Sequence, residues 1–264
     1  MGKTCAYLKF NRHSVNSLRC LQYWSAVFKN RGIEYFLLCD LEPPQLPSLQ
    51  GAVPLKSDTK LRQRLAGKLA ANWVNAGAAH LTCFTHSLSN GFTDFWNIDA
   101  DDTIFFASPN SIADGLRKVE DYSNLENIDS ISLDMYQTFQ WHWSFGVAFT
   151  RNTREYQSLL DSISADTIAR AYPTINGGKP FIRNEDGLPY CLPGYNGNID
   201  WYFTLMRDRQ DIEARSFYFE DSYFAHVGIF GYDTIGQLTN GTYYWSKGRL
   251  WDRPINADCI RFDL

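Results

Sequence analysis

Strand and helix patterns alternate along the first hundred residues, and this alternation constrains the fold more than any other feature of the sequence. Residues 4–10, 34–39 and 93–98 are short β-branched, aromatic and aliphatic runs that predict buried strands. Between them, the apolar spacing predicts one helix over 14–30, and a second that starts after Asp58 and continues to residue 76. Strands and helices in this order form a mostly parallel sheet with helices on both faces. We therefore expect an α/β fold with a Rossmann-like, mostly parallel central sheet flanked by helices.

The rest of the chain has a less regular pattern. We expect strands over 52–55, 131–135, 144–150 and 214–219, helices over 151–162 and 199–211, and a long loop over 172–197. Residues 78–89 fit a helix or a strand equally well, and the tail is typical of aromatic and glycine-rich loops. The sequence shows no internal repeat, low-complexity segment or clear linker, so a single domain is the simplest organisation.

Charge and cysteine content argue against several classes of protein. The 264 residues include 25 Lys and Arg against 29 Asp and Glu, a net charge of -4. A nucleic-acid binder would need a basic face to neutralise phosphates, so we expect no nucleic-acid partner. The six cysteines form no CxxC pair, which argues against a zinc site and for reduced thiols. No run approaches the ~18 apolar residues of a membrane span. The N-terminus also lacks the apolar segment of a signal peptide, so we expect a cytoplasmic protein without a transmembrane segment.

An acidic cluster follows the predicted strand 93–98. Asp99, Asp101 and Asp102 place three carboxylates within four residues, and Asp40 similarly follows the strand 34–39. In parallel sheets, ligands bind beyond the carboxyl ends of the strands, where both acidic positions lie. Clustered carboxylates repel one another unless a cation lies among them, and Mg²⁺ or Mn²⁺ binds one or two carboxylates together with substrate phosphates. The pattern favours a divalent-cation site; the alternative is a solvated acidic turn in which Asp102 or Thr103 caps the next segment.

The run from Phe95 to Asp102, FWNIDADD, resembles the DxD motif of nucleotide-sugar glycosyltransferases with the GT-A fold, particularly bacterial enzymes that carry DADD after the fourth strand. This resemblance implies a single GT-A-like domain over 1–264, with a nucleotide-binding half over about 1–108 and a smaller, irregular acceptor half over about 109–264. It also implies Mn²⁺ or Mg²⁺ as cofactor and a nucleotide diphosphate sugar as donor. The implied acceptor is a glycan, lipid-linked or protein molecule. Peripheral association with the inner membrane is compatible with such a cytoplasmic enzyme.

The resemblance also implies roles for individual residues. These roles are metal ligation by Asp99, Asp101, Asp102 and the late His226; nucleotide contacts by Asp40, Lys68, Asn72 and Asp99; and general-base catalysis by Asp200, with Asp134 as the second candidate. Simpler explanations stay open for several of them. Asp200 can cap a helix, His226 can be a hydrogen-bonded core residue, and Lys68 can be a solvated helix residue. For Asp134, the alternative is a solvated strand end.

Two other functions stand as alternatives. Residues 99–103, DADDT, also fit the DxDxT nucleophile motif of haloacid-dehalogenase-like phosphatases, in which Asp99 attacks a phosphoryl group. Asp101 would then be the acid/base, and Glu220 or Asp221 would help to hold Mg²⁺. That nucleophile strand usually comes first, whereas two or three predicted strands precede Asp99 here. The second alternative is a sugar- or nucleotide-binding module without turnover. We expect an enzyme, a glycosyltransferase of the hexosyltransferase type, because the acidic motif and a candidate base are both present.

Overall fold

Seven strands form the central sheet of the chain. The computed structural model describes residues 2–11, 15–67, 69, 71–101, 103–105, 108–134, 146–171, 181–183, 189–191, 199, 202–203, 206, 213–218, 224–226, 232–238, 241–246 and 249–251. Within them, the sheet contains β1 (Thr4–Lys9), β2 (Glu34–Leu38), β3 (Val53–Leu55), β4 (Asp94–Asp99), β6 (Ser130–Asp134), β7 (Val147–Arg151) and β10 (Ala214–Tyr218). Their order is β10-β6-β7-β4-β1-β2-β3. Only β7 runs antiparallel to its neighbours in this described sheet, so the expected mostly parallel α/β architecture is confirmed.

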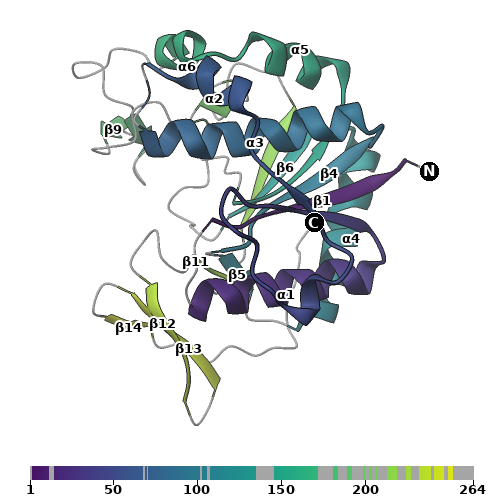
Figure 1. Ribbon diagram of the computed structural model, residues 1–264, viewed down its shortest axis with the longest axis vertical. Coiled ribbons are helices and arrows are strands. Elements are labelled where there is room, and N and C mark those ends of the chain that lie inside the picture. The colour runs from purple at the N-terminus through teal and green to yellow at the C-terminus, as the bar shows by residue number, and fades with distance from the viewer. Residues whose placement is uncertain are drawn as a thin grey trace.

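Helices cover both faces of this sheet (Figure 1). On one face lie α1 (Val15–Arg31) and α4 (Pro109–Glu126); on the other lie α2 (Thr59–Leu65), α3 (Ala71–Ser89), α5 (Arg154–Ser162) and α6 (Ala165–Ala171). Alternate side chains of β1 enter the two cores: Cys5 and Tyr7 pack with α3, whereas Ala6 and Leu8 pack with α1. No helix in the described parts of the chain has the length and apolar content that a membrane crossing requires.

The single helix predicted between Asp58 and residue 76 is wrong, because the chain forms two helices there. The predicted cap is confirmed: the Asp58 carboxylate accepts a hydrogen bond from the Lys60 amide at 2.7 Å at the start of α2. α2 ends at Leu65, and Gly67 has a φ of 99°, a left-handed conformation that interrupts the helical path. Leu65 is buried in the same core as α3, so the four-residue apolar spacing marks one core that two helices cover. The ambiguous residues 78–89 belong to α3.

Several elements were not predicted from the sequence. α4 and α6 are two of them, and the other elements are the 3₁₀ helix η1 (Pro47–Leu49), β5 (Thr103–Phe105), β8 (Phe181–Arg183), β9 (Pro189–Cys191), β11 (Phe224–His226), β12 (Tyr232–Leu238), β13 (Gly241–Ser246) and β14 (Arg249–Trp251). β8 and β9 pair inside the segment expected to be one long loop, and β12, β13 and β14 form an antiparallel sheet in the tail. The expectation of a tail made of loops is therefore wrong, because its β-branched and aromatic residues form hairpins.

A buried ion pair ties α1 and α4 to the sheet. The Glu120 carboxylate of α4 accepts one hydrogen bond from Arg31 of α1 and another from the indole N–H of Trp96 of β4, each at 2.5 Å. The side chains of Arg31 and Glu120 are only 5% and 14% exposed. Because an unpaired charge at this depth is strongly destabilising, Glu120 fixes the positions of three elements relative to one another.

Candidate functional site

The carboxyl ends of the parallel strands lie at one edge of the sheet, and most of the predicted acidic residues occur there. Asp99 is the last residue of β4, Asp134 is the last residue of β6, and Asp40 lies two residues beyond β2. Lys9 is the last residue of β1, and the register of β1 with β4 sets it directly opposite Asp99. The fold therefore brings together acidic positions that are far apart in the sequence, at the edge where α/β sheets bind ligands.

Lys9 is the centre of a buried polar chain beneath this edge. Its ammonium group forms an ion pair with the Asp99 carboxylate and donates to Nδ1 of His80 on α3 at 2.7 Å. The amide group of Asn97 on β4 donates to the same nitrogen at 3.0 Å. Lys9, His80 and Asn97 are 5%, 6% and 0% exposed, whereas the Asp99 side chain is 26% exposed. This row of hydrogen-bonded side chains therefore extends from the solvent-accessible Asp99 carboxylate into the core between the sheet and α3.

The two donors on Nδ1 set the protonation state of His80. Because this nitrogen accepts, the proton of the neutral ring is on Nε2. Burial lowers the pKa of His80 well below 6.5, and the positive charge of Lys9 lowers it further. At the buried end of this row of hydrogen-bonded side chains, the Cys83 thiol donates to Oδ1 of Asn97 at 3.5 Å. Burial raises the pKa of Cys83 to about 12 although Lys9 opposes this effect, so the thiol stays protonated.

Asn11 connects the acidic turn to the end of β2. Its backbone N–H donates to Oδ2 of Asp101 at 2.9 Å, and its side-chain Oδ1 accepts from the backbone N–H of Asp40 at 2.7 Å. The backbone N–H of Ala100 also donates to the carbonyl oxygen of Lys9 at 2.9 Å. These bonds fix the Asp101 carboxylate relative to the ends of β1, β2 and β4.

The Asp40 carboxylate holds the segment that follows β3. It accepts hydrogen bonds from the backbone N–H and the hydroxyl of Ser57, each at 3.0 Å, and forms an ion pair with Arg62 on α2. The side chains of Arg62 and Asp40 are 34% and 24% exposed, so the pair is accessible from solvent. Asp40 thus places α2 beside the end of β2. Its predicted contact with a nucleotide stays a prediction.

Strand pairing places the backbone of His226 close to the acidic turn. β11 pairs antiparallel with β5, and His226 is opposite Thr103. Thr103 comes two residues after Asp101, so a late strand reaches the segment that carries the acidic cluster. Ligation of a metal by His226 stays a prediction.

The remaining predicted residues lie wholly or partly outside the described part of the chain. Lys68, Asp102 and Asp200 are outside the described residues. For Asn72 on α3 and Asp134 on β6, the backbone is described. Their predicted roles therefore stay predictions.

The described carboxylates fit a cation that is shared with a phosphate ligand. Across the described ranges, no group of three or more His, Cys, Asp or Glu side chains is arranged to hold a metal. Asp99 and Asp101 supply carboxylate oxygens, the ligands that Mg²⁺ and Mn²⁺ prefer, and such ions often take one or two protein carboxylates and complete their shell with substrate phosphates and water. The donor set is thus suited to a diphosphate-bound divalent cation.

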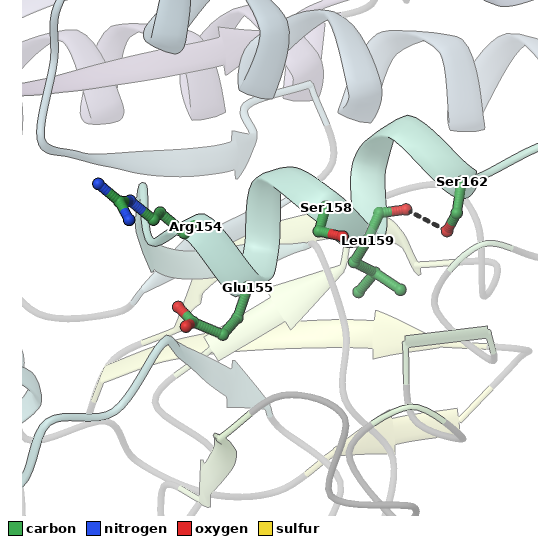
Figure 2. A pocket seen from close by; sticks show the side chains of 5 residues that line it. All are labelled: Arg154, Glu155, Ser158, Leu159 and Ser162. Carbon is green, nitrogen blue, oxygen red and sulfur yellow. Dashed lines mark hydrogen bonds between the residues drawn. The ribbon is translucent and has the colours of Figure 1, made fainter.

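A surface depression on α5 does not include these residues. It has a volume of about 480 Å³ and is lined by Arg154, Glu155, Ser158, Leu159 and Ser162, all from one helix (Figure 2). α5 follows β7, which runs antiparallel to β4, so the helix begins near the opposite edge of the sheet from the acidic turn. The edge that carries the carboxylates is therefore the candidate site.

Sequence reasoning did not assign Lys9, Asn11, His80 or Asn97 to this site. A signal for Lys9 was present, because a lysine at the end of an apolar strand needs a charged or polar partner when it is buried. The partners were not visible, since His80 lies 71 residues from Lys9 in the sequence. Only the packing of α3 on β1 and β4 brings these side chains together.

Comparisons with known proteins give a likeness of chain path. No family model matches the sequence, and no curated protein matches it. Similar solved structures include glucosyl-3-phosphoglycerate synthase from Mycobacterium tuberculosis with Mn²⁺, UDP and glucosyl-3-phosphoglycerate, at 10% identity and a TM-score of 0.44, covering 82% of this chain and 70% of that chain. The same enzyme with Mn²⁺, UDP-glucose and phosphoglyceric acid matches at 10% identity and a TM-score of 0.44, covering 96% and 89%. At this identity and TM-score, the likeness concerns the path of the chain and gives no information on its activity.

Proposed function

We propose that the chain is a metal-dependent glycosyltransferase that moves a sugar from a nucleotide diphosphate donor to a glycan, lipid-linked or protein acceptor. The observation that carries the proposal is the position of Asp99 and Asp101 at the carboxyl end of β4, beside the ends of β1 and β2. A diphosphate with its cation is the ligand that best matches accessible carboxylates at this edge of a parallel sheet.

The residues at this edge have separate tasks in the proposed reaction. Asp101, with Asp99 or Asp102, would hold Mn²⁺ or Mg²⁺, which when bound neutralises charge on the leaving nucleoside diphosphate. Asn11 orients the Asp101 carboxylate through its backbone N–H. Asp200 would deprotonate the acceptor hydroxyl, with Asp134 as the second candidate for this base.

The test is turnover of a panel of nucleotide sugars by the full chain with Mn²⁺, with Mg²⁺ and with chelator. We expect release of nucleoside diphosphate only when a divalent cation is present. Asp101→Ala should reduce this release by at least about a hundredfold, because a cation that stabilises developing charge contributes several kcal/mol. Asp114→Ala is the matched control, since Asp114 is an exposed aspartate paired with Arg117 on α4. Equal activity of the two variants would contradict the metal role of Asp101.

The same assay separates the competing functions. Release of inorganic phosphate from phosphomonoesters, lost in Asp99→Asn, would identify a phosphatase. Binding of nucleotide sugars without turnover would identify a binding module. For the base, Asp200→Asn should lower kcat by about 10²–10⁴-fold while donor affinity is unchanged, as expected for loss of a proton acceptor. Equal loss of binding and turnover would assign Asp200 a structural role.

A further inference from the structure

The ion pair between Lys9 and Asp99 distinguishes Asp99 from the other aspartates of the acidic turn. We infer that Lys9 is a positioning residue: it holds the Asp99 carboxylate in one orientation and balances its charge, so that the net negative charge of the turn lies on Asp101 and Asp102. The inference rests on the proposed function, because it concerns the cation and the donor diphosphate that this turn would bind.

Contacts with buried side chains hold the Lys9 ammonium group in place. A lysine side chain is flexible and loses about 2 kcal/mol of rotamer entropy when it is immobilised, so a surface lysine rarely holds a partner in place. Lys9 is 5% exposed, and its ammonium group donates to Nδ1 of His80 at 2.7 Å while it pairs with Asp99. Asn97 holds the same ring nitrogen at 3.0 Å. The ammonium group is therefore held on two sides, and its position determines where the Asp99 carboxylate lies.

The charges of the turn support the same conclusion. Asp99, Asp101 and Asp102 contribute three negative charges within four residues, and Lys9 contributes one positive charge in direct contact with the first of them. The neutral His80 adds none. The net charge of the cluster is then close to minus two, which matches a divalent cation. Without the lysine, the turn would attract a cation more strongly but would hold Asp99 less firmly.

A double-mutant cycle tests the ion pair without any ligand. The free energies of unfolding in urea are compared for the wild-type chain, the single variants Lys9→Met and Asp99→Asn, and the double variant. We expect non-additivity equivalent to at least a factor of about two in the unfolding equilibrium constant, as residues in contact show. Additive effects would overturn the inference, because Lys9 would then not act through Asp99.

Binding of Mn²⁺ alone, measured by calorimetry at pH ~8, separates the charge effect from damage to the fold. Lys9→Met should bind Mn²⁺ on the order of tenfold more tightly, from Coulomb's law for one removed positive charge in a water-like dielectric. A purely structural role predicts weaker binding instead. Lys3→Met is the matched control, since Lys3 precedes β1 at the opposite edge of the sheet and pairs with Glu34 on the surface. Weaker or unchanged Mn²⁺ affinity in Lys9→Met would overturn the inference.

A second variant tests positioning without changing charge. His80→Leu removes the acceptor that holds the ammonium group but leaves Lys9 and Asp99 charged. It should lower kcat for donor turnover by about tenfold to a hundredfold, as misplaced groups do, while Mn²⁺ affinity stays at the wild-type value. Unchanged kcat would overturn the positioning role, and this variant decides the matter if Lys9→Met does not fold. If the wild-type chain turns over no nucleotide sugar, the proposed function fails, whereas the unfolding cycle and the Mn²⁺ titration still decide the role of Lys9.

Discussion

His80 should make the stability of the fold fall in mildly acidic solution. The ring is 6% exposed, and its Nδ1 accepts from the Lys9 ammonium group at 2.7 Å and from the Asn97 amide at 3.0 Å. A proton on this nitrogen would remove both hydrogen bonds and place an imidazolium beside a lysine. Burial and the charge of Lys9 therefore lower the pKa of His80 in the folded state, whereas in the unfolded chain it titrates near 6.5.

The size and sign of the effect follow from proton binding. Below pH ~6.5 the unfolded chain binds a proton at His80 that the folded chain does not bind, so folding loses about 1.4 kcal/mol per pH unit. The contribution is complete above the unfolded pKa and declines as the pH falls toward the folded pKa. His86 adds to the slope because burial lowers its pKa too, an effect that Glu34 partly offsets.

The assay is urea unfolding of the wild-type chain and of His80→Gln at several pH values between about 7.5 and 5, above the range in which most carboxylates titrate. Glutamine does not titrate, and its amide oxygen can accept a hydrogen bond from Lys9. The variant should lose about 1.4 kcal/mol per pH unit less than the wild type below pH ~6.5. His86→Gln is the control for a histidine that is less buried. If the wild type and His80→Gln have parallel curves over this range, His80 titrates normally in the folded state and the reasoning fails.

Two further predictions concern the scaffold. Glu120→Ala should lower the free energy of unfolding by about 3–5 kcal/mol, because it leaves the Arg31 guanidinium buried without its carboxylate. Urea unfolding checks this. A loss below about 1 kcal/mol would contradict the reasoning, because it would show that solvent reaches and screens the charge left on Arg31. Asp58→Ala should cost about 1 kcal/mol through loss of the N-cap of α2, whereas Asp58→Asn should stay near wild type. Equal costs for the two Asp58 variants, measured by thermal unfolding, would contradict the capping role.

The sequence pattern predicted the strands of the sheet well because buried parallel strands are continuous apolar runs. β1, β2 and β4 begin and end within about one residue of the predicted runs. The break between α2 and α3 was missed because apolar residues continue at helical spacing across Gly67. α4 was missed although Ile112, Leu116 and Val119 have helical spacing and are buried. In both cases the apolar pattern shows which residues enter the core, and it does not show where a helix begins or ends.

The candidate site was predictable only at the level of strand ends. The positions of Asp40 and Asp99 follow from strand order, because parallel strands place their carboxyl ends at one edge. Which groups contact each carboxylate depends on packing between distant segments. Arg62 pairs with Asp40 because α2 packs beside the end of β2, and His80 reaches Lys9 because α3 lies across β1. No local pattern encodes these contacts.

The contact between Lys9 and Asp99 follows from two features of the sheet: the face toward which each strand residue points, and the register of β1 with β4. Odd-numbered residues of β1 face α3, as Cys5 and Tyr7 show, and β4 has the same parity, since Phe95 packs in that core. The register sets residue 9 opposite residue 99, so a lysine there meets the aspartate on the α3 side. A lysine one position earlier would enter the apolar core between the sheet and α1, where it would be opposite Ile98. Within β1, the last position is therefore the one from which a lysine can pair with Asp99, and it is also the position nearest the acidic turn.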